Sequence, residues 1–200
     1  MFQAPFFRRD FPALEGGRVR LRAPEAGDYA EWAALREESR GFLQPWEPQW
    51  APDELSRSAY RQRLRRYRIE FDQGTSISFF LFEKERGRLA GGISIGSIRL
   101  GVARSAHIGY WMGERYAGQG LMLDALHLVI PFAFNRLNLH RLEAACIPGN
   151  RRSVRLLEKA GFQQEGLLRS YLRINGVWQD HFLYALIAGE HLRNQGEARA

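Results

Sequence analysis

Hydrophobic and polar residues alternate along several short segments of the chain, and this period of two is typical of half-buried strands. The first such segment is Arg18–Ala23, which Pro24 ends. The pair Asn175-Gly176 separates the last two segments and is a strong signal for a two-residue hairpin turn. The strand-like segments are 18–23, 76–85, 89–98, 107–112, 140–147 and the two runs that flank Asn175-Gly176.

Between these segments, apolar residues recur at the three- and four-residue spacing of a helix. This spacing predicts helices over 25–40 and 52–71, and a third helix over 118–137 that is apolar nearly all round. A fourth helix is expected to begin after Asn150, a favoured N-cap residue, and to stop at Gly161.

The order of strands and helices predicts a single α/β domain over residues 18–188. Its core would be a mixed, mostly antiparallel sheet of about seven strands with helices that flank it. We expect residues 1–17 to form a loose leader without the apolar core of a signal peptide, and residues 189–200 to form a tail. No apolar run approaches the roughly 18 residues that cross a bilayer.

The register of the last hairpin follows if Asn175-Gly176 is a two-residue turn. The strands then pair residue by residue away from the turn. The expected partners are Ile174 and Val177, Arg173 and Trp178, Leu172 and Gln179, Tyr171 and Asp180, and Ser170 and His181.

The composition, with 45% apolar and 26% charged residues, is that of a globular protein. The formal net charge is +7, which favours acidic partners such as a ribosome or RNA. The alternative is a set of solvated arginine faces, and the predicted helix over 52–71 has one, formed by Arg57, Arg61, Arg63, Arg65, Arg66 and Arg68. The single cysteine, Cys146, excludes an internal disulfide and fits the reducing cytoplasm, and no metal site is expected.

The strongest chemical signal is an Arg-x-x-Gly-x-Gly turn formed by Arg115, Gly118 and Gly120, just before the most apolar helix. N–H groups in the first turn of a helix lack internal partners and lie at the positive end of the helix dipole, so they bind phosphate well. A P-loop requires Lys-Ser/Thr after its last glycine, whereas Leu121-Met122 follows here. A dinucleotide fingerprint requires its glycines directly after the first strand of the fold. The turn therefore indicates a different phosphate-bearing ligand.

The glycine turn comes first, a strand follows, and then comes a helix that begins Asn150-Arg-Arg-Ser153 and ends in Gly161-Phe162. This order of motifs resembles the GCN5-related N-acetyltransferases (GNAT). The Asn150–Ser153 motif and Glu165-Gly166 are similar to the Rim group, which acetylates ribosomal proteins. The segments 42–48 (FLQPWEP) and 170–186 resemble its RimJ type most, which acts on the N-terminal alanine of small-subunit ribosomal protein five. The resemblance covers about residues 18–186. It implies acetyl-coenzyme A as cosubstrate and a splayed pair of parallel strands at the coenzyme site.

The resemblance also implies roles for individual residues. The turn would hold the coenzyme pyrophosphate, and backbone N–H groups of residues 110–112 would polarise the thioester carbonyl as an oxyanion hole does. Asn150 would contact the pantetheine arm, and Ser153 would protonate the departing thiolate. The expected coenzyme-binding residues are Tyr110, Trp111, Met112, Gly113, Arg115, Tyr116, Ala117, Gly118, Gln119, Gly120, Asn150 and Ser153.

The acceptor side is expected to hold Trp46, Glu47, Tyr171 and Asp180, with Tyr171 a candidate catalytic residue beside Ser153. The glutamate that some relatives use as general base falls on Leu172 in this chain. Glu47 and Asp180 remain as acidic candidates, and a structural hydrogen bond explains each equally well. An α-amine has a pKa of about 7.7–8.0 and a lysine side chain about 10.4, so a site without a base suits a protein N-terminus better than lysine.

We therefore expect a cytoplasmic N-acetyltransferase that uses acetyl-coenzyme A without a metal and acts on a protein N-terminus, as a monomer or homodimer with no membrane contact. One alternative is an enzyme of the same class with a small cationic acceptor, such as an antibiotic or a polyamine, which would favour an acidic pocket. Another is a non-catalytic module that binds acetyl-coenzyme A, or RNA through the arginine face.

Overall fold

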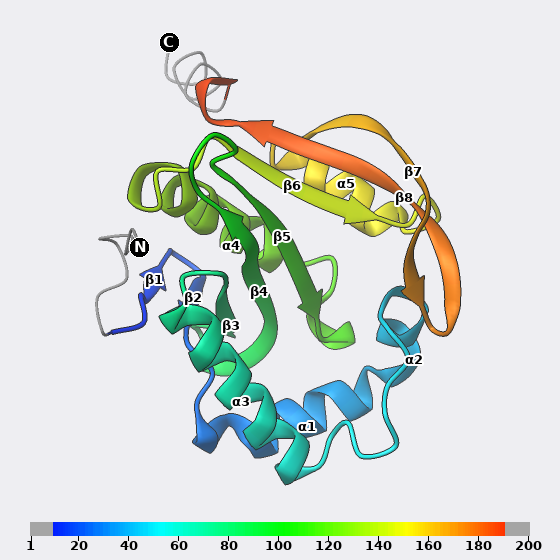
Figure 1. The fold of residues 1–200 in the computed structure, drawn as a ribbon. Helices are drawn as coiled ribbons and strands as arrows, with labels where there is room; N and C mark the ends of the chain where they lie inside the picture. The colour runs from blue at the N-terminus through cyan, green and yellow to red at the C-terminus, as the bar shows by residue number, and fades with distance from the viewer. Residues whose placement is uncertain (1–9, 191–200) are drawn as a thin grey trace.

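The computed structural model describes residues 10–190, which form one mixed sheet of eight strands covered by helices (Figure 1). The strand order is β1-β2-β3-β4-β5-β6-β8-β7, and every neighbouring pair is antiparallel except β5 and β6, which run parallel. The predicted α/β class and mixed sheet are confirmed. The strands are β1 (Leu14–Glu15), β2 (Val19–Arg22), β3 (Ile77–Glu83), β4 (Arg88–Arg99), β5 (Ser105–Met112), β6 (Arg141–Cys146), β7 (Gln163–Ile174) and β8 (Val177–Ile187).

The strand that the sequence pattern missed is β1, which lies inside the expected leader and pairs with β2. Two residues are too few to show an alternating pattern. The sheet therefore begins at Leu14, while residues 1–9, like residues 191–200 of the expected tail, lie outside the described range.

The helices connect the strands and cover both faces of the sheet. They are α1 (Tyr29–Glu38), α2 (Arg40–Leu43), α3 (Arg57–Asp72), α4 (Leu121–Pro131) and α5 (Arg151–Lys159). Short 3-10 turns lie at η1 (Ala26–Asp28), η2 (Gln44–Trp46) and η3 (Glu114–Tyr116), and the π-helical turn η4 (Phe132–Arg136) continues α4. Within residues 10–190, no helix is long and apolar enough to cross a membrane.

Strand β3 shows why both faces need a cover. Its side chains alternate between two hydrophobic clusters, so the whole strand is apolar and not only every second residue. Phe79 and Leu81 join the larger cluster with α4, whereas Phe80 and Phe82 join a smaller one with Trp32 of α1.

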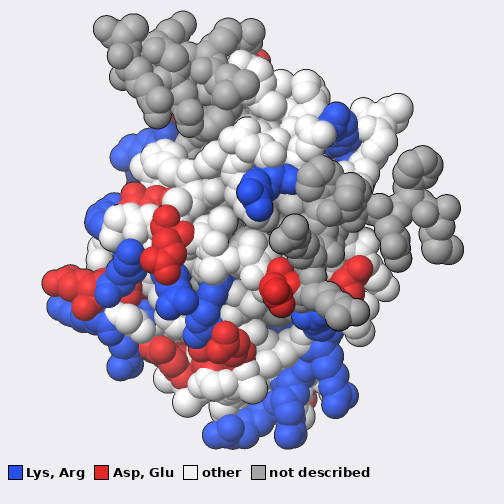
Figure 2. Space-filling model, turned by 90° about the vertical axis from the view of Figure 1, so that its left-hand side faces the viewer, with Lys and Arg blue, Asp and Glu red and all other residues white. Residues whose placement is uncertain are grey.

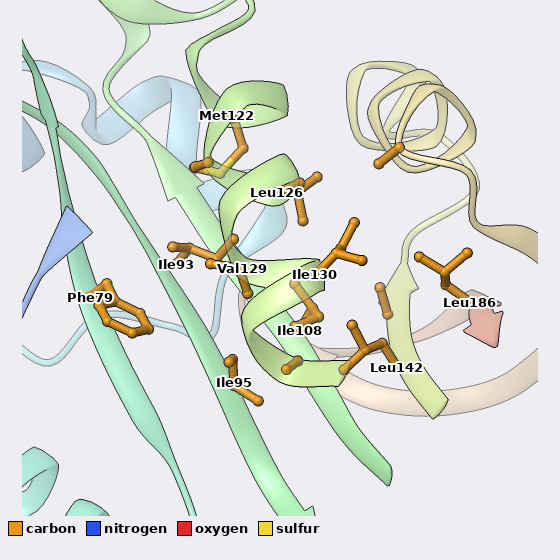
Figure 3. Packing of buried hydrophobic residues seen from close by; sticks show 14 of the residues in the cluster. Phe79, Ile93, Ile95, Ile108, Met122, Leu126, Val129, Ile130, Leu142 and Leu186 are labelled. Carbon is orange, nitrogen blue, oxygen red and sulfur yellow. The ribbon is translucent and has the colours of Figure 1, made fainter. Parts of the chain in front are cut away.

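The larger cluster fills the space between the sheet and α4 (Figure 3). Because α4 packs against strands on one side and α5 on another, it is apolar over most of its surface, as the sequence indicates. Figure 3 shows its side chains reaching toward residues from several strands. The labelled members are Phe79, Ile93, Ile95, Ile108, Met122, Leu126, Val129, Ile130, Leu142 and Leu186.

The bounds of α3 and α4 differ from the prediction. Helix α3 begins at Arg57 and not at residue 52, because the Ser56 side chain accepts a hydrogen bond from the Ala59 N–H (3.1 Å) and caps the helix there. Regular α4 covers Leu121–Pro131 and not 118–137. Gly120, directly before the helix, has a left-handed backbone and so cannot be part of it. After Pro131, which lacks an N–H group, the chain continues as the wider π-helical turn η4.

The β7–β8 hairpin keeps the expected register only near its turn. The pairs Ile174–Val177, Arg173–Trp178 and Leu172–Gln179 are confirmed. Beyond them His181 pairs with Leu168, so the predicted pairs of Ser170 with His181 and of Tyr171 with Asp180 are wrong. Residues 169–171 form a bulge in which Ser170 has φ 45° and its N–H donates to Asp180 Oδ1 (2.8 Å). The Asp180 carboxylate thus takes the N–H that a regular ladder would use.

Candidate active site

The site lies where the parallel strands β5 and β6 part. They pair over only three positions, Ser105 with Arg141, Ala106 with Leu142 and His107 with Glu143. Beyond these residues the two strands diverge, which Figure 1 shows as β5 and β6 running in different directions. Residues Tyr110–Met112 of β5 therefore pair with β4 alone.

The glycine turn follows β5 and leads into α4. Gly118 has φ 80° and Gly120 has φ 82°, a left-handed backbone that strains any residue with a Cβ. Gly113 has a different reason to be glycine, since a Cβ there would collide with Leu35 of α1. The Asp124 N–H donates to the Gly120 carbonyl as α4 begins, so the preceding first-turn N–H groups have no acceptor within the helix. The backbone of this turn is suited to an anion.

Two arginines lie at the turn. Arg115 pairs with Glu38 (3.1 Å), and its side chain remains 42% exposed. Arg18, the residue before β2, reaches the turn, where its Nη1 donates to the Gln119 carbonyl (3.1 Å) and its Nε to Asp124 (2.7 Å). A Cβ on Gly120 would lie 3.0 Å from Arg18 Nη2. The sequence analysis missed Arg18, because nothing local connects it with a turn about a hundred residues away.

A hollow of about 940 Å³ opens beside these arginines. It lies between the glycine turn and the turn that joins β3 to β4, and basic residues outnumber acidic ones in its lining. The charged lining residues are Arg18, Lys84, Arg86, Arg88 and Arg115 against Glu83 and Glu85.

The first turn of α5 reaches the point where β5 and β6 part. The predicted N-cap is confirmed, because Asn150 Oδ1 accepts a hydrogen bond from the Ser153 N–H (3.1 Å). The Ser153 hydroxyl in turn lies 2.6 Å from the Tyr110 hydroxyl of β5. The structure thus brings together three of the predicted residues, and Tyr110 takes part through its side chain.

Burial controls the protonation of the groups around Ser153. It raises the pKa of the Tyr110 phenol well above its usual range, although the hydrogen bond to Ser153 acts in the opposite direction. Burial also raises the pKa of the Cys146 thiol, to about 11. Both groups are therefore neutral near pH 7, and the buried Cys146 thiol is a poor nucleophile.

Glu47, a candidate for the acceptor side, is held by other side chains. Arg36 donates to both of its carboxylate oxygens (3.1 and 2.5 Å), and Trp50 Nε1 donates to one of them (2.8 Å). Arg36 is only 6% exposed, and its guanidinium faces the rings of Trp50 (4.5 Å) and Trp111 of β5 (5.0 Å). This cluster ties the loop around Glu47 to α1 and to β5. No local pattern in the sequence pointed to Arg36.

The remaining acceptor-side residues lie on the hairpin and on the neighbouring loop. The Asn175 N–H donates to the Glu47 carbonyl (2.9 Å), which joins the tip of the β7–β8 hairpin to the loop. The aromatic residues Trp46, Tyr171 and Trp178 are all exposed, at 38%, 36% and 61%. The rings of Tyr171 and His181 pack edge to face, with their centroids 5.8 Å apart. No hydrogen bond joins Tyr171 to Ser153 among the described residues.

The arginine face of α3 is partly neutralised by acidic neighbours. Its ion pairs are Arg63 with Glu54, Arg66 with Glu70 and Arg68 with Asp72. Figure 2 shows acidic and basic side chains next to one another on one face of the molecule. These contacts favour a solvated, ion-paired face as the explanation for the arginines of α3.

The fold and the site define the class of protein. Residues 18–163 match the family model described as an acetyltransferase (GNAT) domain. The chain belongs to this family and is an N-acetyltransferase. The resemblance inferred from the glycine turn and the Asn150–Ser153 motif is therefore confirmed.

Its relatives specify the group within the family. The chain is 36% identical over 174 residues to the probable N-acetyltransferase YjcK of Bacillus subtilis, covering 87% of this chain and 96% of the relative. It is 34% identical over 182 residues to the ribosomal protein uS5-alanine N-acetyltransferase of Escherichia coli, covering 90% and 94%. Among solved structures, RimJ of Mycobacterium smegmatis in complex with CoA-disulfide superposes with a TM-score of 0.83 at 33% identity, covering 90% of this chain and 88% of that one.

Proposed function

We propose that this enzyme transfers the acetyl group of acetyl-coenzyme A directly to the N-terminal α-amine of a ribosomal protein, and that the acceptor is the N-terminal alanine of small-subunit protein five. One observation supports the proposal above all. Where β5 and β6 part, Tyr110 of β5, just before the glycine turn, contacts Ser153 in the first turn of α5, which Asn150 caps. The names of the uS5-alanine and RimJ relatives support the acceptor. The cytoplasm, where ribosomal proteins are made, is then its place of action.

The residues at the glycine turn fit the phosphates of the coenzyme. The backbone around Gly118 and Gly120 supplies N–H donors at the start of α4, and Arg18 and Arg115 supply positive charge beside them. A Cβ on Gly120 would enter this cradle. The remaining turn residues expected to line the coenzyme are Gly113, Tyr116, Ala117 and Gln119, and Asn150 would contact the pantetheine arm.

The chemistry proposed for the site is a direct transfer. Backbone N–H groups of Tyr110–Met112, on the part of β5 that no longer pairs with β6, would polarise the thioester carbonyl. Ser153 would protonate the departing thiolate. The high pKa of the Cys146 thiol argues against an acetyl-cysteine intermediate, because little thiolate exists near pH 7.

Both acidic residues considered as a general base already accept hydrogen bonds. Glu47 accepts three hydrogen bonds from Arg36 and Trp50, and Asp180 accepts the Ser170 N–H. An α-amine with a pKa of about 7.7–8.0 is partly neutral at pH 7 and has less need of a base than lysine. We therefore propose that Glu47 and Asp180 shape the acceptor side, and that the exposed rings of Trp46 and Tyr171 contact the acceptor peptide there.

The test compares acceptors. The enzyme is incubated with acetyl-coenzyme A and with peptides that begin with Ala, Ser or Met, and thiol release and the mass of the peptide are measured. We expect acetylation at the N-terminal amine, fastest with Ala. A peptide with a blocked N-terminus and an internal lysine serves as the control and should remain unmodified. Turnover only with lysine, kanamycin or spermidine would contradict the proposed acceptor.

A further inference from the structure

The contact between Tyr110 and Ser153 joins two elements at the point where β5 and β6 part. Tyr110 lies on β5, Ser153 lies in the first turn of α5, and their hydroxyl oxygens are 2.6 Å apart. The Ser153 N–H is already used, because it donates to Asn150 Oδ1. Backbone and side chain of Ser153 are thus both held. The remaining freedom of its hydroxyl is the direction of its hydrogen, and the Cys146 thiol is a second side chain that interacts with this hydroxyl.

That direction depends on which hydroxyl donates. A serine hydroxyl has one hydrogen to donate and two lone pairs, so a hydrogen bond received from Tyr110 leaves the serine hydrogen free for another acceptor. A phenol is a better hydrogen-bond donor than an aliphatic hydroxyl, because the ring withdraws electron density from its oxygen. The better donor gives its hydrogen to Ser153, and this also polarises the serine O–H bond.

We propose that Tyr110 is a positioning residue, which donates its phenol hydrogen to Ser153 and so directs the Ser153 hydroxyl hydrogen toward the coenzyme sulfur. The inference rests on the proposed function, since it assigns a device to the donor side of that site. Burial keeps the Tyr110 phenol protonated, so the arrangement persists at neutral and mildly alkaline pH.

The step balances without a further reactant. The amine nitrogen forms a bond to the carbonyl carbon, and the bond between that carbon and sulfur breaks, with its electron pair on sulfur. The sulfur takes the Ser153 hydroxyl proton. The amine nitrogen loses one proton as the amide forms, and Ser153 regains a proton from that source through solvent. Tyr110 keeps its own proton throughout.

The test is a double-mutant cycle on the full chain, with acetyl-coenzyme A and a peptide that begins with Ala. The variants are Tyr110→Phe, Ser153→Ala and the double variant. A matched control is Tyr184→Phe, which removes another buried phenol hydroxyl that is bonded to Glu158 and Gln164 instead. The measurements are kcat from thiol release, KM for acetyl-coenzyme A, and thermal unfolding of every variant.

We expect Ser153→Ala to lower kcat about a hundredfold, the range for loss of a positioned proton donor. Tyr110→Phe should lower kcat about tenfold, as the loss of one orienting hydrogen bond allows, with KM for acetyl-coenzyme A unchanged. In the Ser153→Ala background, Tyr110→Phe should have no further effect, because Tyr110 acts through the serine. Tyr184→Phe should retain the wild-type kcat.

Two results would overturn the inference. One is a wild-type kcat in Tyr110→Phe, and the other is the same loss from Tyr110→Phe whether or not Ser153 is present. If the wild-type enzyme acetylates spermidine but no peptide, the proposed acceptor fails, and the cycle is run with spermidine because both residues act on the donor. Absence of thiol release with every amine would remove the proposed function and the inference with it.

Discussion

Replacing Glu47 by glutamine tests whether this residue is a base or a structural partner. The substitution keeps the shape of the side chain but removes its charge, while Arg36 stays 6% exposed. The side chains of the pair are 7% and 19% exposed, so solvent screens the interaction little. Breaking a buried ion pair on one side costs about 3–5 kcal/mol, because the remaining charge is uncompensated. The rings of Trp50 and Trp111 beside the guanidinium offset part of this cost.

We therefore expect Glu47→Gln to lower the free energy of unfolding by about 3 kcal/mol. For a chain of this length each kcal/mol corresponds to about 2–4 °C, so Tm should fall by about 6–12 °C. Urea and thermal unfolding measure this directly. The KM for the acceptor peptide should rise, because the loop around Glu47 is then held less firmly against β5. Replacing both Arg36 and Glu47 by leucine should restore part of the stability, since no buried charge remains unpaired.

A matched control is Glu37→Gln, whose partner Arg40 is 42% exposed, and this variant should keep the wild-type Tm. The reasoning would be refuted if Glu47→Gln kept the wild-type Tm and the peptide KM while kcat fell by about a hundredfold or more, the result expected from the loss of a general base.

Three further outcomes follow from the described contacts. Gly120→Ala should lower the free energy of unfolding by about 1–2 kcal/mol, because Gly120 has a left-handed φ of 82°, and it should weaken acetyl-coenzyme A binding measured by calorimetry. The control Gly27→Ala, at a position with open space around it, should change neither quantity. Asn150→Ala should lower stability by about 1 kcal/mol through loss of the cap, measured by urea unfolding, with weaker coenzyme binding. Burial raises the pKa of Cys146 from 9.0 to about 11, so stability should fall as pH rises from 9 toward 11. Cys146→Ala should reduce this loss, and the part that remains comes from buried phenols such as Tyr110, whose pKa is also raised.

Local patterns predicted what local forces determine. The Asn150 cap, the stop at Gly161 and the glycines of the turn were readable because their causes lie within a few residues. Strand β3 was readable from its apolar run, and the family from the order of the motifs. The hairpin register could be predicted only near Asn175-Gly176. The bulge beyond it depends on a hydrogen bond from the Ser170 N–H to the Asp180 side chain, which the alternating pattern does not reveal.

The parts that escaped prediction depend on residues far apart in the chain. Tyr110 and Ser153 are 43 positions apart, and Arg18 is separated from Asp124 by 106. The alternation along β5 was a usable signal for Tyr110, because it places this side chain on the same face as Ile108, toward α4. For the pairing of Arg36 with Glu47 the sequence held no such periodic signal.

The two outer strands of the sheet have a consequence for how the protein behaves at high concentration. An open sheet edge presents unpaired N–H and C=O groups on which a strand of another molecule can form, which is a route to aggregation. One edge here is β1, with two residues, and the other is β7, which the bulge at 169–171 interrupts. Over the residues that the structure describes, neither edge is both long and regular. The fold is therefore protected against growth of its sheet by intermolecular pairing, even though the exposed hairpin that ends it carries Trp178 and Val177.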